Sequence, residues 1–465
     1  MKIKSLLVAF LLPFSAVLTL AAPATMRLDY YHTGNVRQEI FSVDRVVLEP
    51  LPWPGAPGKN IDNSNLGNYF FEVRDRRSGR ILYSRGFNSV YGEWVTTEEA
   101  KNASRTFSES LRFPAPQAPV DVVLEKRQQG RFVVVWTTNI DPQDKFIDTS
   151  HPPSPGPLLT IQKMGEPATK VDLLVLGDGY TAGEREKFEN DARRFADMLF
   201  AVSPFREHRQ DFNLWGLCPA AEESGISRPS SGIHRRNPLG STYDTFDTER
   251  YVLTVENRAL RDVASYAPYE FVEILVNGNT YGGGGIFNLY GIVAIDNIWA
   301  FYVGVHEFGH HFAALADEYY TSQVAYLPAS KHTEPWEPNV TALLDPKNLK
   351  WKDLIEPGTP IPTPWRKQEF EALEKEIQKQ RVQIRASNLP ESEMNKLLQE
   401  SEKREEMLLA EEKYAGKVGA FEGADYEAHG YYRPEANCIM FTRHKSFCAV
   451  CRRAIEKIIG MYASE

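Results

Sequence analysis

The residues His306-Glu-Phe-Gly-His310 carry the clearest chemical signal in this sequence. Side chains four positions apart share one face of an α-helix, so His306 and His310 can bind one Zn²⁺ through their ring nitrogens. Glu307 then lies beside the same ion and can act as general base for a water molecule that the metal activates. The pattern predicts a zinc-dependent hydrolase with one catalytic zinc ion as its cofactor. The alternative is a pair of helix histidines whose nitrogens are satisfied by hydrogen bonds.

A catalytic zinc site needs three protein ligands and one open position, so a further ligand must lie beyond His310. The candidates are Asp317, Glu318 and a more distant acid. His311 points away from the face that His310 occupies, so we do not expect it to bind the metal.

The position of Asp317 makes a demand on the backbone. It follows His306 by eleven residues, so a straight helix would place it on the correct face but about 10 Å beyond His310. Asp317 can reach the metal only if the helix ends near Ala313 or Ala314. Such a turn requires a positive φ on an alanine, which costs roughly 1 kcal/mol.

The start of the chain has the pattern of a secretory signal peptide. Lys2 and Lys4 precede an apolar stretch, 5–20, which is short for a membrane span and contains Pro13. Alanines at 21, 22 and 24 suit cleavage. We expect residues 1–24 to be removed and the mature protein to be secreted or periplasmic; a retained anchor is the alternative.

Composition narrows the choice of partners. The formal net charge is −9 and no Lys/Arg-rich face stands out, which disfavours nucleic acid and anionic membranes. No later stretch is apolar over 18 or more residues, so we expect no membrane association after signal cleavage. A protein or peptide substrate is the expected partner, and the sequence does not indicate an oligomeric state.

The four cysteines are Cys218, Cys438, Cys448 and Cys451. In an exported protein, disulfides are the leading interpretation. The spacing of Cys448 and Cys451 also fits half of a structural zinc site with Cys438 as a third thiolate. Free thiols are the third alternative.

The length of 465 residues predicts two or three domains. Residues 25–150 contain short alternating strands joined by glycine turns, which favours an all-β sandwich. Its clearest strands are expected at 70–74, 80–83, 122–127 and 131–136. The prolines of residues 151–165 then predict a stiff linker.

Residues 166–465 have an α/β character. A helix begins at Thr181 and continues to about Val202, and strands are expected at 171–176, 212–217, 271–276 and 286–295. The last strand lies between a glycine loop and the HExxH helix. It is a candidate for an exposed edge to which an extended peptide could add; the alternative is an ordinary core strand.

Residues 366–413 combine dense charge with apolar side chains at heptad-like spacing. The stretch predicts a helical hairpin inserted into the catalytic region. It could form a rim that limits or recruits substrate, or serve as a solvated spacer.

The chain resembles the IgA-peptidase family of zinc metallopeptidases, which belong with the metzincin-like zincins, over nearly all of the mature sequence. The N-terminal part is similar to that family's β domain through residues 84–87 and 91–94. The catalytic part carries the resemblance in segments 176–181, 281–286, 306–310, 314–319, 437–440 and 447–451.

The resemblance implies a site. His306, His310 and Asp317 correspond to zinc ligands and Glu307 to the catalytic base. Met440 corresponds to a Met-turn, a thioether floor that packs beneath the metal.

Many metzincins carry a tyrosine two residues after this methionine, where the present chain has Thr442. Support for the transition state or substrate must then come from elsewhere. The candidates are Tyr426, His429, Tyr431 and Tyr432.

The leading hypothesis is a secreted zinc endopeptidase with a metzincin-like catalytic domain behind an N-terminal β-sandwich. One alternative is a catalytically weak or inactive peptidase-like binding protein at the cell surface or in the periplasm. Intact His306, Glu307 and His310 disfavour it, since a decayed site usually loses its base. Another alternative is a zinc hydrolase that acts on a non-peptide amide.

Overall fold

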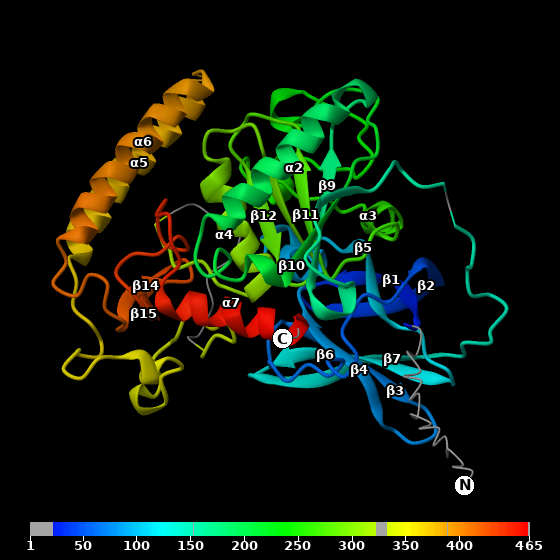
Figure 1. Cartoon of the computed structure of the whole chain (residues 1–465). Coiled ribbons are helices and arrows are strands. Elements are labelled where there is room, and N and C mark those ends of the chain that lie inside the picture. The colour runs from blue at the N-terminus through cyan, green and yellow to red at the C-terminus, as the bar shows by residue number, and fades with distance from the viewer. Residues whose placement is uncertain (1–21, 152, 322–332, 388, 464–465) are drawn as a thin grey trace, which may run out of the picture.

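The computed structural model describes residues 22–151, 153–321, 333–387 and 389–463 (Figure 1). The expected signal peptide lies outside these ranges except for its last three residues. Ala24 already begins strand β1 (Ala24–Asn35).

The N-terminal region consists of two antiparallel sheets. One has the order β2 (Gln38–Pro52), β1 and β5 (Arg105–Pro114); the other has the order β4 (Ile81–Phe87), β3 (Tyr69–Asp75), β6 (Val120–Gln128) and β7 (Arg131–Ile140). Buried side chains from both sheets form one hydrophobic core, among them Leu28, Phe71, Phe113 and Leu124. This arrangement agrees with the predicted β-sandwich.

The catalytic region is built on a six-stranded sheet. Its order is β12 (Gly283–Ile286), β13 (Tyr290–Ala294), β11 (Phe271–Val276), β9 (Val171–Asp178), β10 (Phe212–Leu217) and β8 (Leu159–Gln162). The four inner strands are parallel and the two outer strands are antiparallel to their neighbours. Every residue of β9, β10 and β11 is buried, which explains their nearly continuous apolar sequences. Strand β8 lies within the stretch 151–165 that was expected to be a linker.

The expected single edge strand at 286–295 is wrong. The chain turns at Asn288, whose φ is +55°, and Leu289 donates a backbone hydrogen bond to Ile286. Residues 290–294 therefore form the inner strand β13, and the preceding glycine run forms the edge strand β12. A Cβ added at Gly285 would lie 2.2 Å from the carbonyl oxygen of Glu307, so the glycine is needed for this close approach to the HExxH helix.

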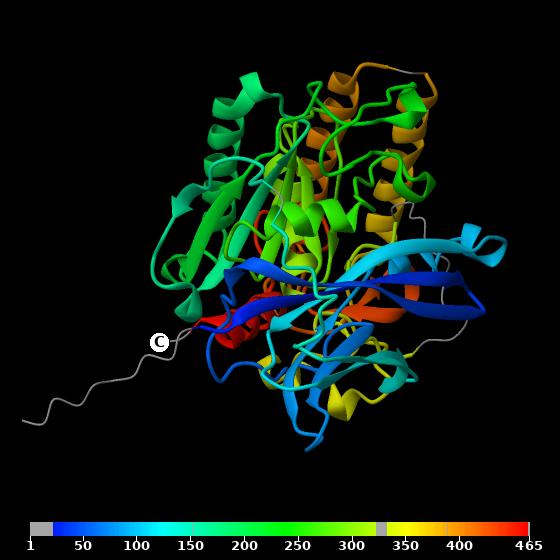
Figure 2. The same cartoon turned by 90° about the vertical axis from the view of Figure 1, so that its right-hand side faces the viewer.

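Helices cover both faces of the large sheet (Figures 1 and 2). One face packs against α2 (Arg185–Phe200), α4 (Ala300–Ala313) and α7 (Ala449–Tyr462). The other face packs against α3 (Asn257–Ala264) and against α1 (Val90–Trp94), which comes from the N-terminal region. Figure 2 shows the N-terminal strands in blue and cyan beneath this sheet.

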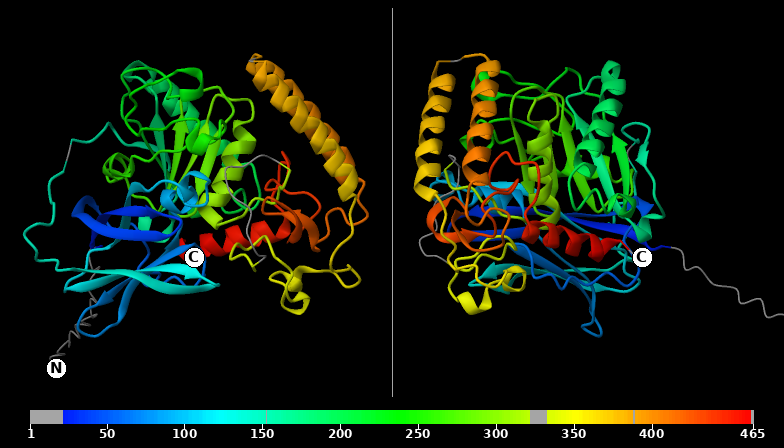
Figure 3. Two further views of the ribbon diagram at one scale, coloured as in Figure 1. Left: turned by 180° about the vertical axis from the view of Figure 1, so that it is seen from behind. Right: turned by 60° about the vertical axis from the view of Figure 1, so that its left-hand side comes forward.

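Two long helices, α5 (Lys367–Ala386) and α6 (Glu391–Ala410), run side by side as an arm next to the large sheet (Figure 3). They lie within the range predicted for a helical hairpin. The small sheet of β14 (Phe421–Ala424) and β15 (Glu427–Arg433) follows. Among the described residues, no helix combines the length and apolar character needed to cross a bilayer.

Candidate active site

The end of α4 places Asp317 beside the two histidines. The helix stops at Ala313, and Ala314 adopts a left-handed conformation with φ +56° and ψ +32°. Its N–H donates to the carbonyl of His310, and Leu315 N–H donates to that of Gly309, so the turn closes the helix by hydrogen bonds. The prediction of a helix end with a positive φ on an alanine is confirmed.

Three potential ligand atoms converge beyond this turn. Asp317 Oδ1 lies 2.9 Å from His306 Nε2 and 3.2 Å from His310 Nε2, and the two nitrogens are 3.1 Å apart. Ligands at 2.0–2.1 Å from a tetrahedral zinc ion are about 3.3 Å from one another. The three atoms therefore have nearly the mutual spacing that one zinc ion requires.

The hydrogen bonds of the histidines orient their rings for such a role. His306 Nδ1 lies 2.9 Å from the carbonyl oxygen of Ile439, and His310 Nδ1 contacts that of Leu315. When each Nδ1 donates its hydrogen, each Nε2 retains a lone pair. Asp317 Oδ1 is buried without a hydrogen-bond donor. Three lone-pair atoms thus face one another, and a cation satisfies them all.

Electrostatics also favour a positive charge at this point. Burial opposes a charge on His310, but Asp317, Glu307 and the Leu315 carbonyl together outweigh it and raise the His310 pKa to about 9. Burial likewise opposes ionisation of Asp317, yet His310 and His306 hold its pKa well below the usual range. Asp317 therefore favours a positive charge next to His306 and His310.

Glu307 lies next to this triad. Its carboxylate comes within 4.8 Å of the ligand atoms of His306 and His310. Burial raises its pKa, Asp317 adds to the rise, and the two histidines oppose it. A partly buried carboxylate with a raised pKa accepts a proton more readily, as a general base requires. The Asp317 oxygen makes the closer contacts with the imidazoles, which makes Asp317 the candidate third ligand and leaves Glu307 as the candidate base.

Met440 belongs to the loop beneath α4. A Cβ added at Gly309 would lie 3.2 Å from the Met440 sulfur, so the glycine lets the loop pack closely against the helix. The adjacent Ile439 carbonyl is the partner of His306, and the Met440 carbonyl accepts a hydrogen bond from Glu318 N–H at 2.8 Å. The loop thus contacts both the histidine helix and the segment after Asp317.

The histidines and Glu307 open into a cleft of about 440 Å³. Edge strand β12 lines one part of it, and Tyr302 and Tyr319 line another. Asn88, Gly92 and Glu93 of the N-terminal region also contribute to the wall. Both regions of the chain therefore shape the space in front of the site.

The four aromatic candidates from the sequence separate into two pairs. Tyr426 and Tyr431 line the cleft, and Tyr426 Oη donates to Asp317 Oδ2 at 2.5 Å. His429 and Tyr432 do not line it, and the prediction of substrate contacts for them is corrected. The His429 side chain is exposed beside Lys367 and Glu422. The half-buried Tyr432 pairs through its backbone with Thr341.

Sequence reasoning missed the residues beside His306. The Tyr319 ring stacks near the His306 ring with centroids 6.3 Å apart, and its hydroxyl accepts a hydrogen bond from Arg250 at 3.1 Å. The Tyr302 ring lies 5.3 Å from the His306 ring on the same helix. Tyr302 could have been found from its spacing of one helical turn, whereas no local pattern marks Arg250.

His311 is buried in the core, away from the two histidines of the site, where it was not expected to bind the metal. Its Nδ1 faces the carbonyl of Ile286, and its Nε2 accepts a hydrogen bond from Val272 N–H. Burial lowers its pKa to about 3. The neutral ring therefore connects α4 to strands β11 and β12 and takes no part in the metal triad.

The expected disulfides do not form. All four cysteines are free, and the sulfurs of Cys438 and Cys451 are 3.9 Å apart, against about 2.05 Å in a disulfide. Cys218 is half-buried. The other three cysteines surround Glu318, which explains why this acid is not a ligand of the histidine site.

Comparison with known families places these features in context. A family model described as IgA Peptidase M64 matches residues 159–459, and one described as Peptidase M64 N-terminus matches residues 19–137. No curated protein matches the chain. The two matches cover the large sheet with its histidine helix and most of the N-terminal sandwich.

Proposed function

Because the chain belongs to the M64 family of IgA peptidases, which are metallopeptidases, we propose that it is a secreted zinc-dependent endopeptidase with Glu307 as its general base. The observation that carries the proposal is the convergence of His306 Nε2, His310 Nε2 and Asp317 Oδ1 within 3.2 Å of one another. This set lies beside a partly buried carboxylate in an open cleft.

The donor set fits zinc in a catalytic arrangement. Two imidazoles and one carboxylate supply three ligands and leave the side facing the cleft open. Zinc bound there supplies Lewis-acid chemistry, which acidifies water and polarises a carbonyl. The glycine-permitted contact of Met440 beneath α4 supports a metzincin-like floor that keeps the histidine rings in place.

Glu307 performs the proton transfers in this proposal. Its carboxylate accepts a proton from water as the water attacks the scissile carbonyl carbon. The same side chain then delivers that proton to the departing amine nitrogen, so the carboxylate is regenerated. Glu307 lines the cleft beside His306 and His310, which supports a role in both transfers.

Strand β12 supports a peptide as the substrate. Gly283 directs its backbone groups outward, where they bond to the backbone of Arg250 and Val252. Gly285, two residues further on, presents its backbone to the same side and lines the cleft. An extended peptide can add to this edge by backbone pairing beside Gly285, since the outward groups of Gly283 are already bonded. A non-peptide amide would not use it.

The arm of α5 and α6 borders a second hollow of about 1120 Å³. Arg381 and Arg385 of α5 line it, together with Arg250 and Tyr281, which also line the main cleft. We propose that the arm, as an insertion in the catalytic domain, forms a rim that limits access for bulky substrates. Secretion rests on the signal-like sequence of residues 1–24.

Cleavage-site profiling tests the proposal. A peptide library from a digested proteome would be incubated with the wild type and with Glu307→Gln, and new termini would be identified by mass spectrometry. We expect cleavages inside the wild-type peptides that chelation abolishes and that the variant lacks. Equal cleavage by the variant, or removal of terminal residues alone, would overturn the assignment. A metal-loaded wild type that cleaves nothing would favour the alternative, an inactive peptidase-like binding protein.

A further inference from the structure

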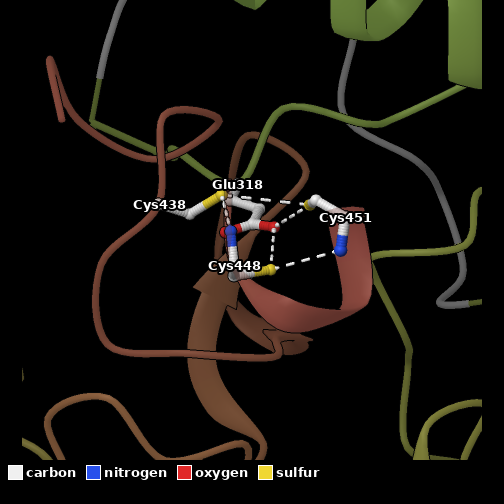
Figure 4. Close-up of side chains that lie close together, drawn as sticks. All are labelled: Glu318, Cys438, Cys448 and Cys451. Carbon is white, nitrogen blue, oxygen red and sulfur yellow. Dashed lines mark hydrogen bonds between the residues drawn. The ribbon is translucent and has the colours of Figure 1, made fainter. Parts of the chain in front are cut away.

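A second group of ligand atoms lies behind the histidine site. Figure 4 shows the side chains of Glu318, Cys438, Cys448 and Cys451 converging on one point. We propose that they bind a second, structural zinc ion, which ties the Met440 loop to the segment that carries Asp317. This inference does not depend on the proposed endopeptidase function.

The spacing of the four ligand atoms fits tetrahedral zinc. All lie within 4.8 Å of one another. The Cys451 sulfur is 3.9 Å from the Cys438 sulfur and 3.3 Å from Glu318 Oε1, and the Cys448 sulfur is 4.0 Å from that oxygen. With Zn–S near 2.3 Å and Zn–O near 2.0 Å, a tetrahedron has S–S and S–O separations of about 3.8 and 3.5 Å.

The four side chains are buried, so their carboxylate and thiolate charges need a nearby cation to balance them. Glu318, Cys438 and Cys451 are 0% exposed and Cys448 is 3% exposed. Glu318 Oε1 accepts a hydrogen bond from Asn339, but Oε2 has no partner. Burying a carboxylate beside three thiols costs free energy unless a metal or hydrogen bonds compensate. A zinc ion would compensate all four groups at once.

The backbone around the cysteines is arranged for thiolates. N–H groups of Met440 and Cys448 point at the Cys438 sulfur, at 3.5 and 3.3 Å. The Cys451 N–H points at the Cys448 sulfur at 3.4 Å, where Cys448 caps the N-terminus of α7. Backbone N–H groups and a helix N-terminus both stabilise a thiolate. The two-residue spacing between Cys448 and Cys451 is the chelating unit of structural zinc sites.

The second site would position the first. Glu318 directly follows Asp317, and Met440 is two residues after Cys438. The same loop supplies the Ile439 carbonyl that orients His306 and the Met440 carbonyl that accepts from Glu318 N–H. A zinc ion joining Glu318 to Cys438 and α7 would therefore fix the position of Asp317 relative to the Met440 loop. It contacts no substrate, so its role is structural.

Metal counting separates this site from the histidine site. The full chain would be loaded with zinc, dialysed, and analysed for bound metal. We expect two zinc ions per chain in the wild type and one in the double variant His306→Ala/His310→Ala, which keeps the buried cluster intact. Cys218→Ser, which changes a cysteine outside the cluster, should retain both ions. If the double variant binds none, the proposal is overturned, whether or not the wild type has peptidase activity.

Cobalt and thiol measurements identify the ligands. The double variant loaded with Co²⁺ should show a thiolate-to-cobalt charge-transfer band in the near ultraviolet, and Cys451→Ser in the same background should weaken it. Because Cys451→Ser can impair folding, thiols are also counted in the unfolded, unreduced double variant. Four free thiols are expected. Two free thiols with a mass lower by two hydrogens would mean a disulfide and would contradict the proposal.

Discussion

At the scale of single residues, the geometry of the histidine site depends on Ala314. Its left-handed conformation turns the chain back so that Asp317 Oδ1 reaches both imidazoles. An alanine carries a steric cost in this conformation that a glycine does not. Two closing hydrogen bonds to α4 and burial of the surrounding residues offset that cost.

Ala314→Gly should therefore stabilise the protein without changing its metal content. We expect a gain of about 0.5–1 kcal/mol in unfolding free energy, seen as a melting temperature higher by about one or two degrees. Ala313→Gly is the matched control. It lies one residue earlier with helical geometry and should destabilise by about 1 kcal/mol. Equal effects at the two positions would contradict the role given to the positive φ.

We predict that Tyr426 influences metal binding through Asp317. Its hydroxyl donates to the Asp317 oxygen that does not face the histidines, and so orients the carboxylate. Tyr426→Phe should weaken zinc binding by roughly 10- to 100-fold, measured by competition with a chelator. Tyr432→Phe, on the nearby strand but outside the cleft, should bind zinc as the wild type does. Unchanged affinity in Tyr426→Phe would refute this role.

At the scale of secondary structure, the sequence predicted the elements whose residue pattern reflects burial alone. Strands β9, β10 and β11 are buried on both faces, so their continuous apolar sequences identified them as strands. Strand β1 was not predicted individually, because it alternates core side chains such as Leu28 with buried charges such as Arg27. Arg27 bonds to Asp262 of α3, a partner 235 positions away that no local pattern reveals.

The same limit applies to the candidate site. The histidines, Glu307 and the turn before Asp317 belong to one local segment, and their arrangement followed from helix geometry. Arg250 and the partnership of Glu318 with the cysteines depend on contacts between distant segments. Tyr432 and His429 were predicted from residue type alone, and their side chains lie outside the cleft although Tyr431 of the same strand β15 lines it.

Strand β11 contains a buried acid, Glu273, whose two carboxylate oxygens have no hydrogen-bond partner. Burial raises its pKa well above the usual value, and Glu307 adds to the rise. The pKa of Glu273 in the folded state is higher than its value of about 4.3 in the unfolded chain. Glu273 therefore makes its full contribution to the free energy of unfolding below about pH 4.3. The contribution is lost as the pH rises through the folded-state pKa.

Glu273→Gln, which cannot ionise, should therefore melt at a higher temperature than the wild type at pH 8, by about two degrees or more. The difference should vanish near pH 4, where the wild-type acid is neutral. Glu456→Gln on the exposed side of α7 is the control and should have little effect at either pH. A wild type that is equally or more stable than Glu273→Gln at pH 8 would contradict the assignment.

At the scale of the whole molecule, the two regions share a hydrophobic core. Val90, Tyr91 and Trp94 of α1 pack with buried residues of β9, β11 and α3. Arg112 of β5 stacks over the Tyr269 ring at 3.6 Å and donates to its carbonyl. The N-terminal region also lines the cleft, so its packing and the shape of the site are connected.

Residues 151–465 expressed alone should therefore be unstable. Removal of the N-terminal region exposes apolar surface on the sheet and on α3, and we expect aggregation or strong binding of a hydrophobic dye, compared with the chain from residue 25 onward. A soluble, monomeric fragment with the peptidase activity of the longer chain would show that the shared core is dispensable.

The central claim is that Glu307 transfers protons beside a metal held by His306, His310 and Asp317. The most direct measurement combines zinc content and kcat/KM for the wild type and Glu307→Gln on one peptide identified by cleavage profiling. We predict equal zinc content and a fall in kcat/KM of at least about 10²- to 10⁴-fold, the usual contribution of general acid–base catalysis. A Glu307→Gln enzyme that binds zinc normally and cleaves at the wild-type rate would contradict the account.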